Sequence, residues 1–173
     1  LNRLNGIIRD IDQALVGATT REEVEQAVCK HLTAGDLYGF ALTLRLRGEN
    51  TLVPHAWTDA GAEFVEDVFP AENLDPETSP GLRALTESEI QVIQSLDAEI
   101  DDPSWKESID AAGIESLAVI PVSYQGTSYG IIVVYGEAAN TFTEREVEVL
   151  TELGETVGYA IAAVERRERE QML

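Results

Sequence analysis

Very few residues of this chain could carry out covalent chemistry. Its 173 residues include one cysteine, Cys29, and two histidines, His31 and His55. Cys29 lies between Val28 and Leu32 on the apolar side of a helical pattern, which favours a buried structural thiol. A single cysteine also excludes an intramolecular disulfide and a thiolate metal cluster. The thiol is therefore predicted to pack rather than to react.

The two histidines are the candidate ligands for haem or a metal ion. His31 lies at the end of a predicted helix, where a positive charge interacts favourably with the helix dipole, so a surface position is predicted. By strict alternation His55 shares one strand face with Val53 and Trp57, and a ligand role competes there with a structural or solvent-facing one. The carboxylates of residues 97–102 could hold a cation, although a solvated loop is the favoured interpretation.

No enzyme is predicted from these residue types. The sequence has no Ser-His-Asp arrangement, P-loop or zinc-ligand spacing. Aromatic residues instead indicate a small-molecule pocket, because apolar walls with a few polar groups are typical of ligand sites. The alternative is that these rings only fill a core, and the face that each strand offers to the pocket stays open. The candidate ligand-binding residues are Tyr38, Phe40, His55, Trp57, Phe64, Phe69, Trp105, Tyr124 and Tyr129, with Tyr135 as a further aromatic of the same group.

The charge of the chain is strongly acidic. It carries 32 acidic and 12 basic residues, a formal net charge of −20, and its only lysines are Lys30 and Lys106. Such a surface indicates adaptation to high salt, where carboxylates hold water and a screening length of roughly 3 Å at 1 M weakens their repulsion. No basic patch is present, so direct nucleic-acid binding is not expected. Without a membrane-length apolar run or a signal peptide, a cytoplasmic setting is predicted.

The elements that would position these residues follow from periodicity and turn signals. Helices are predicted over about 1–16 and from Thr20, and a hairpin over 37–58 places Pro54 on an edge strand. Two short helices occupy a long connection, a strand follows over 89–96, and a short helix runs from Asp102 to Gly113. A second hairpin spans 116–136, and its runs 117–122 and 131–135 are apolar enough for strands covered on both faces.

The last predicted helix begins near Thr143 and carries two apolar stripes, so it needs two partners. One stripe would lie on the sheet, and the other against the first helix or a second subunit. Gly154 and Gly158 are predicted to permit close backbone approach. The candidate dimerisation and signalling residues on the terminal helices are Leu4, Ile8, Ile11, Leu15, Val157, Ile161 and Val164.

Two stretches resemble a known family. Residues 79–164, with "AAGIESLAVIPVSYQGTSYGIIVVYG" and "FTEREVEVLTELGETVGYAIAAVE", resemble the second half of a GAF domain. The opening "NRLNGIIRDIDQALVGATTREEVEQAVCKHL" is similar to the GAF segment of haloarchaeal bacterio-opsin-activator transcription regulators. The resemblance implies an α+β fold with a GAF-like, PAS-related antiparallel sheet of five to six strands in the order 2-1-5-4-3. Its terminal helices would cover one face, and loops and short helices the other.

The resemblance also implies a division of the chain and a function. Residues 1–173 would form one domain: a packing helix over 1–18, the GAF core over 19–164, and the start of a linker helix to a separate helix-turn-helix DNA-binding domain over 165–173. The expected function is sensing of an unidentified small molecule, with a homodimer formed through the terminal helices. The alternative is a structural dimerisation module whose pocket is filled by its own side chains.

No cofactor is assigned, because this sequence lacks the residues that would bind the family's known ligands. Cys29 is misplaced for bilin attachment, and the sulfoxide reductases of this fold need several cysteines. The cyclic-nucleotide pattern is only partly present, in Asn140, Phe142 and Glu144, without the lysine that follows the asparagine. Nothing in the sequence indicates haem or a metal.

Overall fold

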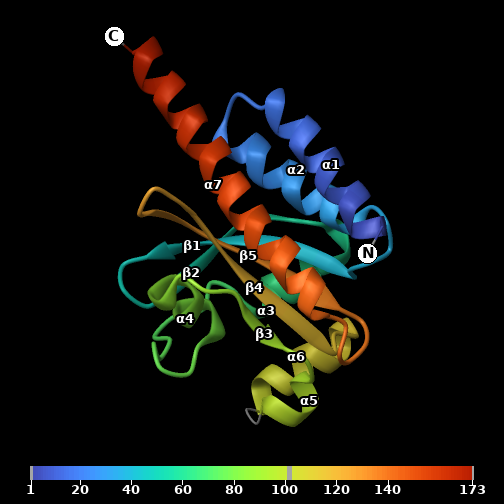
Figure 1. Cartoon of the computed structure of the whole chain (residues 1–173). Coiled ribbons are helices and arrows are strands. Elements are labelled where there is room, and N and C mark those ends of the chain that lie inside the picture. Colours follow the sequence, from blue (N-terminus) through green and yellow to red (C-terminus); the bar gives the residue numbers. More distant parts are fainter. Residues whose placement is uncertain (1, 101–102, 173) are drawn as a thin grey trace.

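The computed structural model describes residues 2–100 and 103–172 (Figure 1). Its elements, in chain order, are α1 (Asn2–Val16), α2 (Arg21–Thr33), β1 (Phe40–Arg47), β2 (Thr51–Trp57), η1 (Asp59–Gly61), α3 (Ala62–Val68), α4 (Pro80–Glu87), β3 (Gln91–Ile93), α5 (Leu96–Glu99), α6 (Pro103–Ala112), β4 (Ser116–Tyr124), β5 (Thr127–Gly136) and α7 (Glu144–Gln171). Within these described ranges, no helix is long and apolar enough to cross a membrane.

The strands form one antiparallel sheet in the order β2-β1-β5-β4-β3. This order confirms the prediction, and β2 with Pro54 lies at an edge as expected. The β4–β5 hairpin occupies the centre. Its turn places Gln125 and Gly126 at φ 49° and 82°, the left-handed pair that matches a tight turn to the twist of the strands.

Two helical layers cover the sheet (Figure 1). Helices α1, α2 and α7 lie on one face, and α3 to α6 with their loops lie on the other. Alternate residues of β5 divide between the two cores: Ile132 and Val134 pack under α1, α2 and α7, while Ile131 and Val133 face the opposite side. The central strands are therefore buried on both faces, which accounts for their continuous apolar runs.

The helix starts follow the capping signals of the sequence. Thr20 accepts a hydrogen bond from the Glu23 N–H at 3.1 Å, and Glu23 accepts one from the Thr19 N–H at 2.7 Å. Thr143 caps α7 in the same way, accepting from the Glu146 N–H at 3.1 Å. These bonds satisfy backbone donors that the first helical turn leaves unpaired.

Helix α7 lies directly on the backbone of β4. A Cβ atom added at Gly154 or Gly158 would stand 2.2 Å from the carbonyl oxygen of Pro121 or Ser123, respectively. Only glycine fits there, as predicted, because any side chain would push the helix off the strand. The second partner of α7 is formed by α1 and α2 of the same chain.

This packing corrects the predicted dimerisation surface, because an apolar stripe does not specify which partner covers it. Leu4, Ile11, Val157, Ile161 and Val164 are at most 1% exposed, and Ile8 and Leu15 pack partly buried against the same core. The first five side chains are covered by the same chain, and a second copy could reach them only by opening this core. Ile8 and Leu15 keep part of their surface exposed.

One predicted boundary also differs. The strand expected over 89–96 is only Gln91–Ile93, because the hydroxyl of Ser95 accepts the Ala98 N–H at 3.4 Å and starts α5. The helix expected to start at Asp102-Pro103 is described from Pro103 onward, and Asp102 lies outside the described residues.

Candidate functional site

A cavity of about 360 Å³ lies on the sheet face opposite the terminal helices. Its floor is formed by strand residues, and its walls come from α3 to α6 and from the loop between α3 and α4. Exposed residues of that loop and of α5, among them Thr78, line one side, so the cavity opens to solvent there. A volume of this order suits a small organic molecule, because ligand sites usually span about 300–1,000 Å³.

Four aromatic residues line the cavity. The rings of Phe64 and Phe69 meet edge to face at 6.4 Å, and those of Phe64 and Tyr135 at 5.5 Å, so neighbouring rings stand at steep angles. Trp105 of α6 is the fourth aromatic. Burial raises the pKa of the Tyr135 hydroxyl, which keeps that wall uncharged.

Phe40 lies directly behind this wall. Its ring stacks on Tyr135 at 4.3 Å and contacts Phe64 at 5.6 Å. A Cβ atom at Gly61 would come within 2.3 Å of the Phe40 ring, so glycine is needed for η1 to pass over it. Phe40 therefore supports the cavity wall without lining the cavity.

The polar residues of the lining are acidic or neutral: Asp75, Thr78, Ser79 and Glu99. Asp75 accepts a hydrogen bond from the Glu77 N–H at 2.9 Å, which fixes its side chain on the loop. Among the described residues that line the cavity there is no lysine, arginine or histidine. The lining thus offers carboxylates and hydroxyls but no positive charge.

Of the aromatic residues proposed from sequence, the structure brings Phe64, Phe69 and Trp105 together with Tyr135 around the cavity. It places Tyr38 on the other face of the sheet, where its ring stacks on Phe142 at 5.6 Å and its hydroxyl donates to Glu146 at 3.1 Å. The chain bends through residues 36–39 and β1 starts only at Phe40, so alternation does not extend back to Tyr38.

A β-bulge in β2 changes the faces on which His55 and Trp57 lie, and neither residue lines the cavity. Leu44 pairs with Pro54 while Thr43 pairs with Ala56, which leaves His55 as the extra residue. Val53 and Trp57 therefore lie on opposite faces, contrary to strict alternation. His55 is exposed and Trp57 is 39% exposed on the edge strand. The predicted shared face is wrong.

A second bulge displaces Tyr129. Val122 pairs with Gly130 and Ser123 pairs with Ser128, so Tyr129 is the extra residue and packs against the core under α1, α2 and α7. Tyr124, at the hairpin tip, packs edge to face on Tyr159 of α7 at 5.1 Å, outside the cavity. Neither residue lines the proposed pocket.

The aliphatic floor of the cavity was not predicted from the sequence, because none of the residues proposed for the lining was aliphatic. Its signal was present in the alternation of the two apolar runs, but that pattern alone does not tell which alternate set faces a cavity. The strand residues of the floor are Leu44, Leu52, Ile93, Leu117, Val119, Ile131 and Val133.

Cys29 lies on α2, and its side chain packs into the core beneath the terminal helices. It is fully buried, and burial raises the pKa of its thiol to about 12, so at neutral pH it is a neutral packing group. Within the residues that the structure describes, no group of three His, Cys, Asp or Glu side chains is arranged to hold a metal ion.

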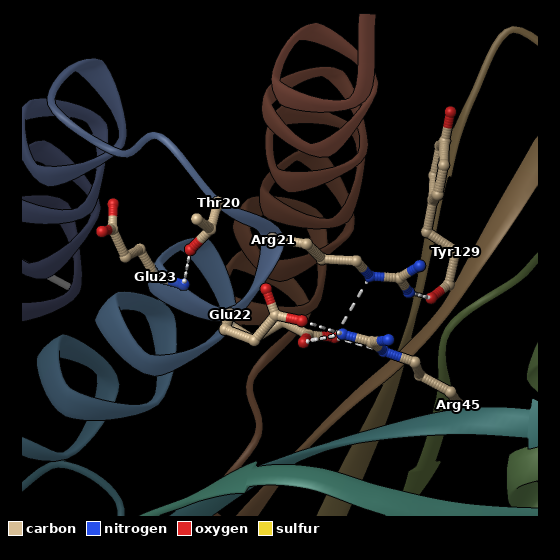
Figure 2. Close-up of polar contacts among 7 residues, drawn as sticks. Thr20, Arg21, Glu22, Glu23, Arg45 and Tyr129 are labelled. Atoms are coloured by element: carbon tan, nitrogen blue, oxygen red, sulfur yellow. Dashed lines mark hydrogen bonds and ion pairs between the residues drawn. The ribbon is translucent and has the colours of Figure 1, made fainter. Parts of the chain in front are cut away.

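The opposite face of the sheet carries a buried polar link between α2 and the strands (Figure 2). Glu25 of α2 is 3% exposed, and its carboxylate accepts from Arg45 of β1 at 2.6 and 3.2 Å. Arg21 lies beside them, with its Nε 3.5 Å from a Glu25 oxygen, an ion pair rather than an aligned hydrogen bond. Arg21 also donates to the carbonyl of Tyr129 on β5 and lies over its ring at 5.6 Å.

The two arginines of this link respond differently to burial. Burial lowers the pKa of Arg21, and the attraction of Glu25 only partly offsets that effect. Burial acts on Arg45 in the same direction, but its hydrogen bonds and attraction to Glu25 outweigh it and raise the pKa. Both remain charged at neutral pH, and their contacts with the Glu25 carboxylate hold α2 against β1 and β5.

Comparisons with known proteins agree with this architecture. The GAF domain model matches residues 18–162. A candidate transcriptional regulator of Haloferax volcanii is 30% identical over 96% of this chain and 27% of its own length. The bacterioopsin transcriptional activator of Halobacterium salinarum is 28% identical over 93% of this chain and 23% of its own length. The chain thus spans about a quarter of these relatives.

A solved structure shares the fold at lower identity. The free methionine-R-sulfoxide reductase of Neisseria meningitidis, in complex with its substrate, superposes with a TM-score of 0.73. It is 14% identical, and the match covers 93% of this chain and 89% of that one, so the likeness concerns the fold alone. The sheet order, the two helical layers and the family match agree, and the chain therefore belongs to the GAF domain family.

Proposed function

We propose that this chain is the sensory module of a haloarchaeal transcriptional regulator and that it binds a small molecule in the cavity beneath α3 to α6. The observation that carries the proposal is the cavity itself: about 360 Å³, with aromatic and aliphatic walls, a few polar groups and an opening to solvent. The family of the chain and the regulators that match nearly its whole length support a sensory role.

Transmission would pass through β1 and β5, because each strand carries a residue of the cavity within two positions of a residue of the polar link. In β1, Leu44 lines the cavity and Arg45 binds Glu25 on the other face. In β5, Ile131 lines the cavity. The backbone carbonyl of Tyr129, two residues before Ile131, accepts a hydrogen bond from Arg21. A ligand that binds two arrangements of these strands with different affinity would shift α2, and with it α7.

The response would reach DNA through a separate domain. With a net charge of −20, this chain is a poor partner for phosphates. Figure 1 shows α7 extending past the other helices, and a rigid helix of this kind would carry a shift onward. Turnover is not part of the proposal, because Cys29 is buried and protonated and the described residues of the cavity lining include no histidine or cysteine.

The competing interpretation, a dimerisation module with a self-filled pocket, has less support. The side chains of the described residues leave the cavity open, and five of the seven apolar residues proposed for dimerisation are buried within one chain. A dimer formed by other surfaces is compatible with sensing.

Ligand retention tests the proposal. The protein would be purified in concentrated KCl and denatured, and the released small molecules would be measured by mass spectrometry. Val133→Phe fills the cavity from its floor, and Val16→Phe makes the same change at a position that is 83% exposed on α1. We expect a compound near one per chain from the wild type and Val16→Phe, and its loss in a folded Val133→Phe variant. Equal retention by both variants would place the ligand elsewhere.

A further inference from the structure

We propose that the cavity selects a small organic cation, specifically one with an alkylated ammonium group on an apolar body. This inference rests on the proposed function, because it names the chemical class of the ligand for that same cavity. It follows from the charge of the lining and from the arrangement of the aromatic rings.

The charged side chains of the lining disfavour an anionic partner. Asp75 and Glu99 are the only charged groups among the described residues of the cavity wall. A carboxylate or phosphate placed there would lose water and meet no arginine or lysine, and a buried charge without a partner is costly. A positive group would meet two carboxylates near the opening. The cavity therefore favours a cation or a neutral molecule over an anion.

The rings then favour the cation over the neutral molecule. The ring planes of Phe64 and Phe69 meet at 75°, and those of Phe64 and Tyr135 at 70°. These neighbouring rings are therefore arranged edge to face rather than stacked in parallel. The face of an aromatic ring carries negative potential and attracts a cation within about 6 Å of its centroid. Trp105, whose indole is the strongest such partner among the aromatic side chains, lines the same cavity.

The apolar floor selects the type of cation. A primary ammonium group needs three hydrogen-bond acceptors, which an aliphatic floor of Leu, Ile and Val side chains does not supply. An alkylated ammonium group spreads its charge over methyl groups and needs none. Salt should weaken the attraction of the exposed Asp75 and Glu99 more than that of the enclosed rings, so selection should persist in concentrated KCl.

Three probes of nearly the same shape test the charge preference: phenyltrimethylammonium, tert-butylbenzene and benzenesulfonate. Binding would be followed by methyl NMR in concentrated KCl. Ile131 and Val133 face the cavity, whereas Ile132 and Val134 pack on the opposite face and serve as internal controls. We expect the cation to shift the first pair and to bind about tenfold tighter than tert-butylbenzene, with no saturable shift from the sulfonate.

A charge variant separates the carboxylate from the rings. Glu99→Gln should weaken binding of phenyltrimethylammonium about threefold and leave tert-butylbenzene unchanged. Asp97→Asn, on the same short helix but outside the lining, is the matched control and should change neither. Equal weakening by both variants would show that only the general acidity of the surface matters.

The outcomes distinguish the two proposals. Tighter binding of tert-butylbenzene or benzenesulfonate in the cavity would overturn the cation preference and leave the sensory function standing. If none of the three probes shifts the methyl groups of Ile131 and Val133, ligand binding at this cavity fails and the cation preference fails with it.

Discussion

Replacing Glu25 by glutamine should destabilise the fold far more than replacing Glu22. Both carboxylates approach Arg45, but Glu25 does so at 2.6 Å with a side chain only 4% exposed, and Glu22 at 3.8 Å with a side chain 73% exposed. Figure 2 shows Glu22 beside the guanidinium group of Arg45. The two variants therefore test the effect of burial alone, because each replaces a glutamate that approaches Arg45 by glutamine.

The magnitudes follow from the two environments. Removing one partner of a buried pair costs about 3–5 kcal/mol, because the remaining charge is left without a partner. The side chains of Arg45 and Arg21 are 24% and 17% exposed, so water can compensate in part and about 3 kcal/mol is expected for Glu25→Gln. An exposed pair contributes little, and Glu22→Gln should cost less than about 0.5 kcal/mol.

Urea unfolding in concentrated KCl would measure both variants, because urea leaves the ionic strength constant. The double variant Glu25→Gln with Arg45→Met should recover part of the loss, since it removes a charge that Glu25→Gln leaves unpaired. A free energy of unfolding for Glu25→Gln within about 0.5 kcal/mol of that for Glu22→Gln would refute the reasoning, because burial would then not matter.

Three further predictions concern the helix interface and the edge strand. Gly154→Ala should destabilise the fold by about 2 kcal/mol or more, because its Cβ would stand 2.2 Å from the Pro121 carbonyl oxygen. In the same urea assay, Gly6→Ala should stabilise α1 by up to about 1 kcal/mol, because nothing lies within 4 Å of a Cβ added there. Val157→Glu should abolish the cooperative thermal transition rather than yield a folded monomer, because the side chain is 1% exposed; a folded monomer by light scattering would contradict this. Partial desolvation and the nearby charge of Arg45 lower the pKa of the exposed His55 below its ordinary value of 6.5. The unfolded chain therefore binds the proton more tightly, and stability should fall as the pH drops below about 6.5, less steeply in His55→Gln.

The sequence predicted the fold well where local chemistry and the family resemblance agreed. The caps at Thr20 and Thr143, the edge position of Pro54 and the central hairpin all follow from residue types at fixed spacings. The close backbone approach predicted at Gly154 and Gly158 is also confirmed, because both lie against carbonyl oxygens of β4. These signals are local, so tertiary context had little chance to override them.

Face assignment failed for two physical reasons. The period of two holds only in an uninterrupted strand, and bulges at His55 and Tyr129 each add one residue that the sequence does not reveal. A helical stripe, moreover, reports that a face is covered but not by which chain. The sequence pattern around Val157 would be the same whether the residue lay in a dimer interface or in the core that it occupies. Both questions concern contacts between distant segments, which no local pattern contains.

The proposed transmission gives the buried ion pair a role that stability alone would not require, since well-packed apolar residues can often replace such a pair without loss. Apolar contacts in the cavity are non-directional, so a small shift of β1 or β5 changes their energy little. The pair between Arg45 and Glu25, at 2.6 Å, weakens quickly as its distance and angle change. A strand shift caused by a ligand would therefore alter the energy mainly at the polar link, which distinguishes one arrangement of α2 from another. Such a difference between two arrangements is what coupling requires, and an apolar contact that tolerates sliding would supply less of it.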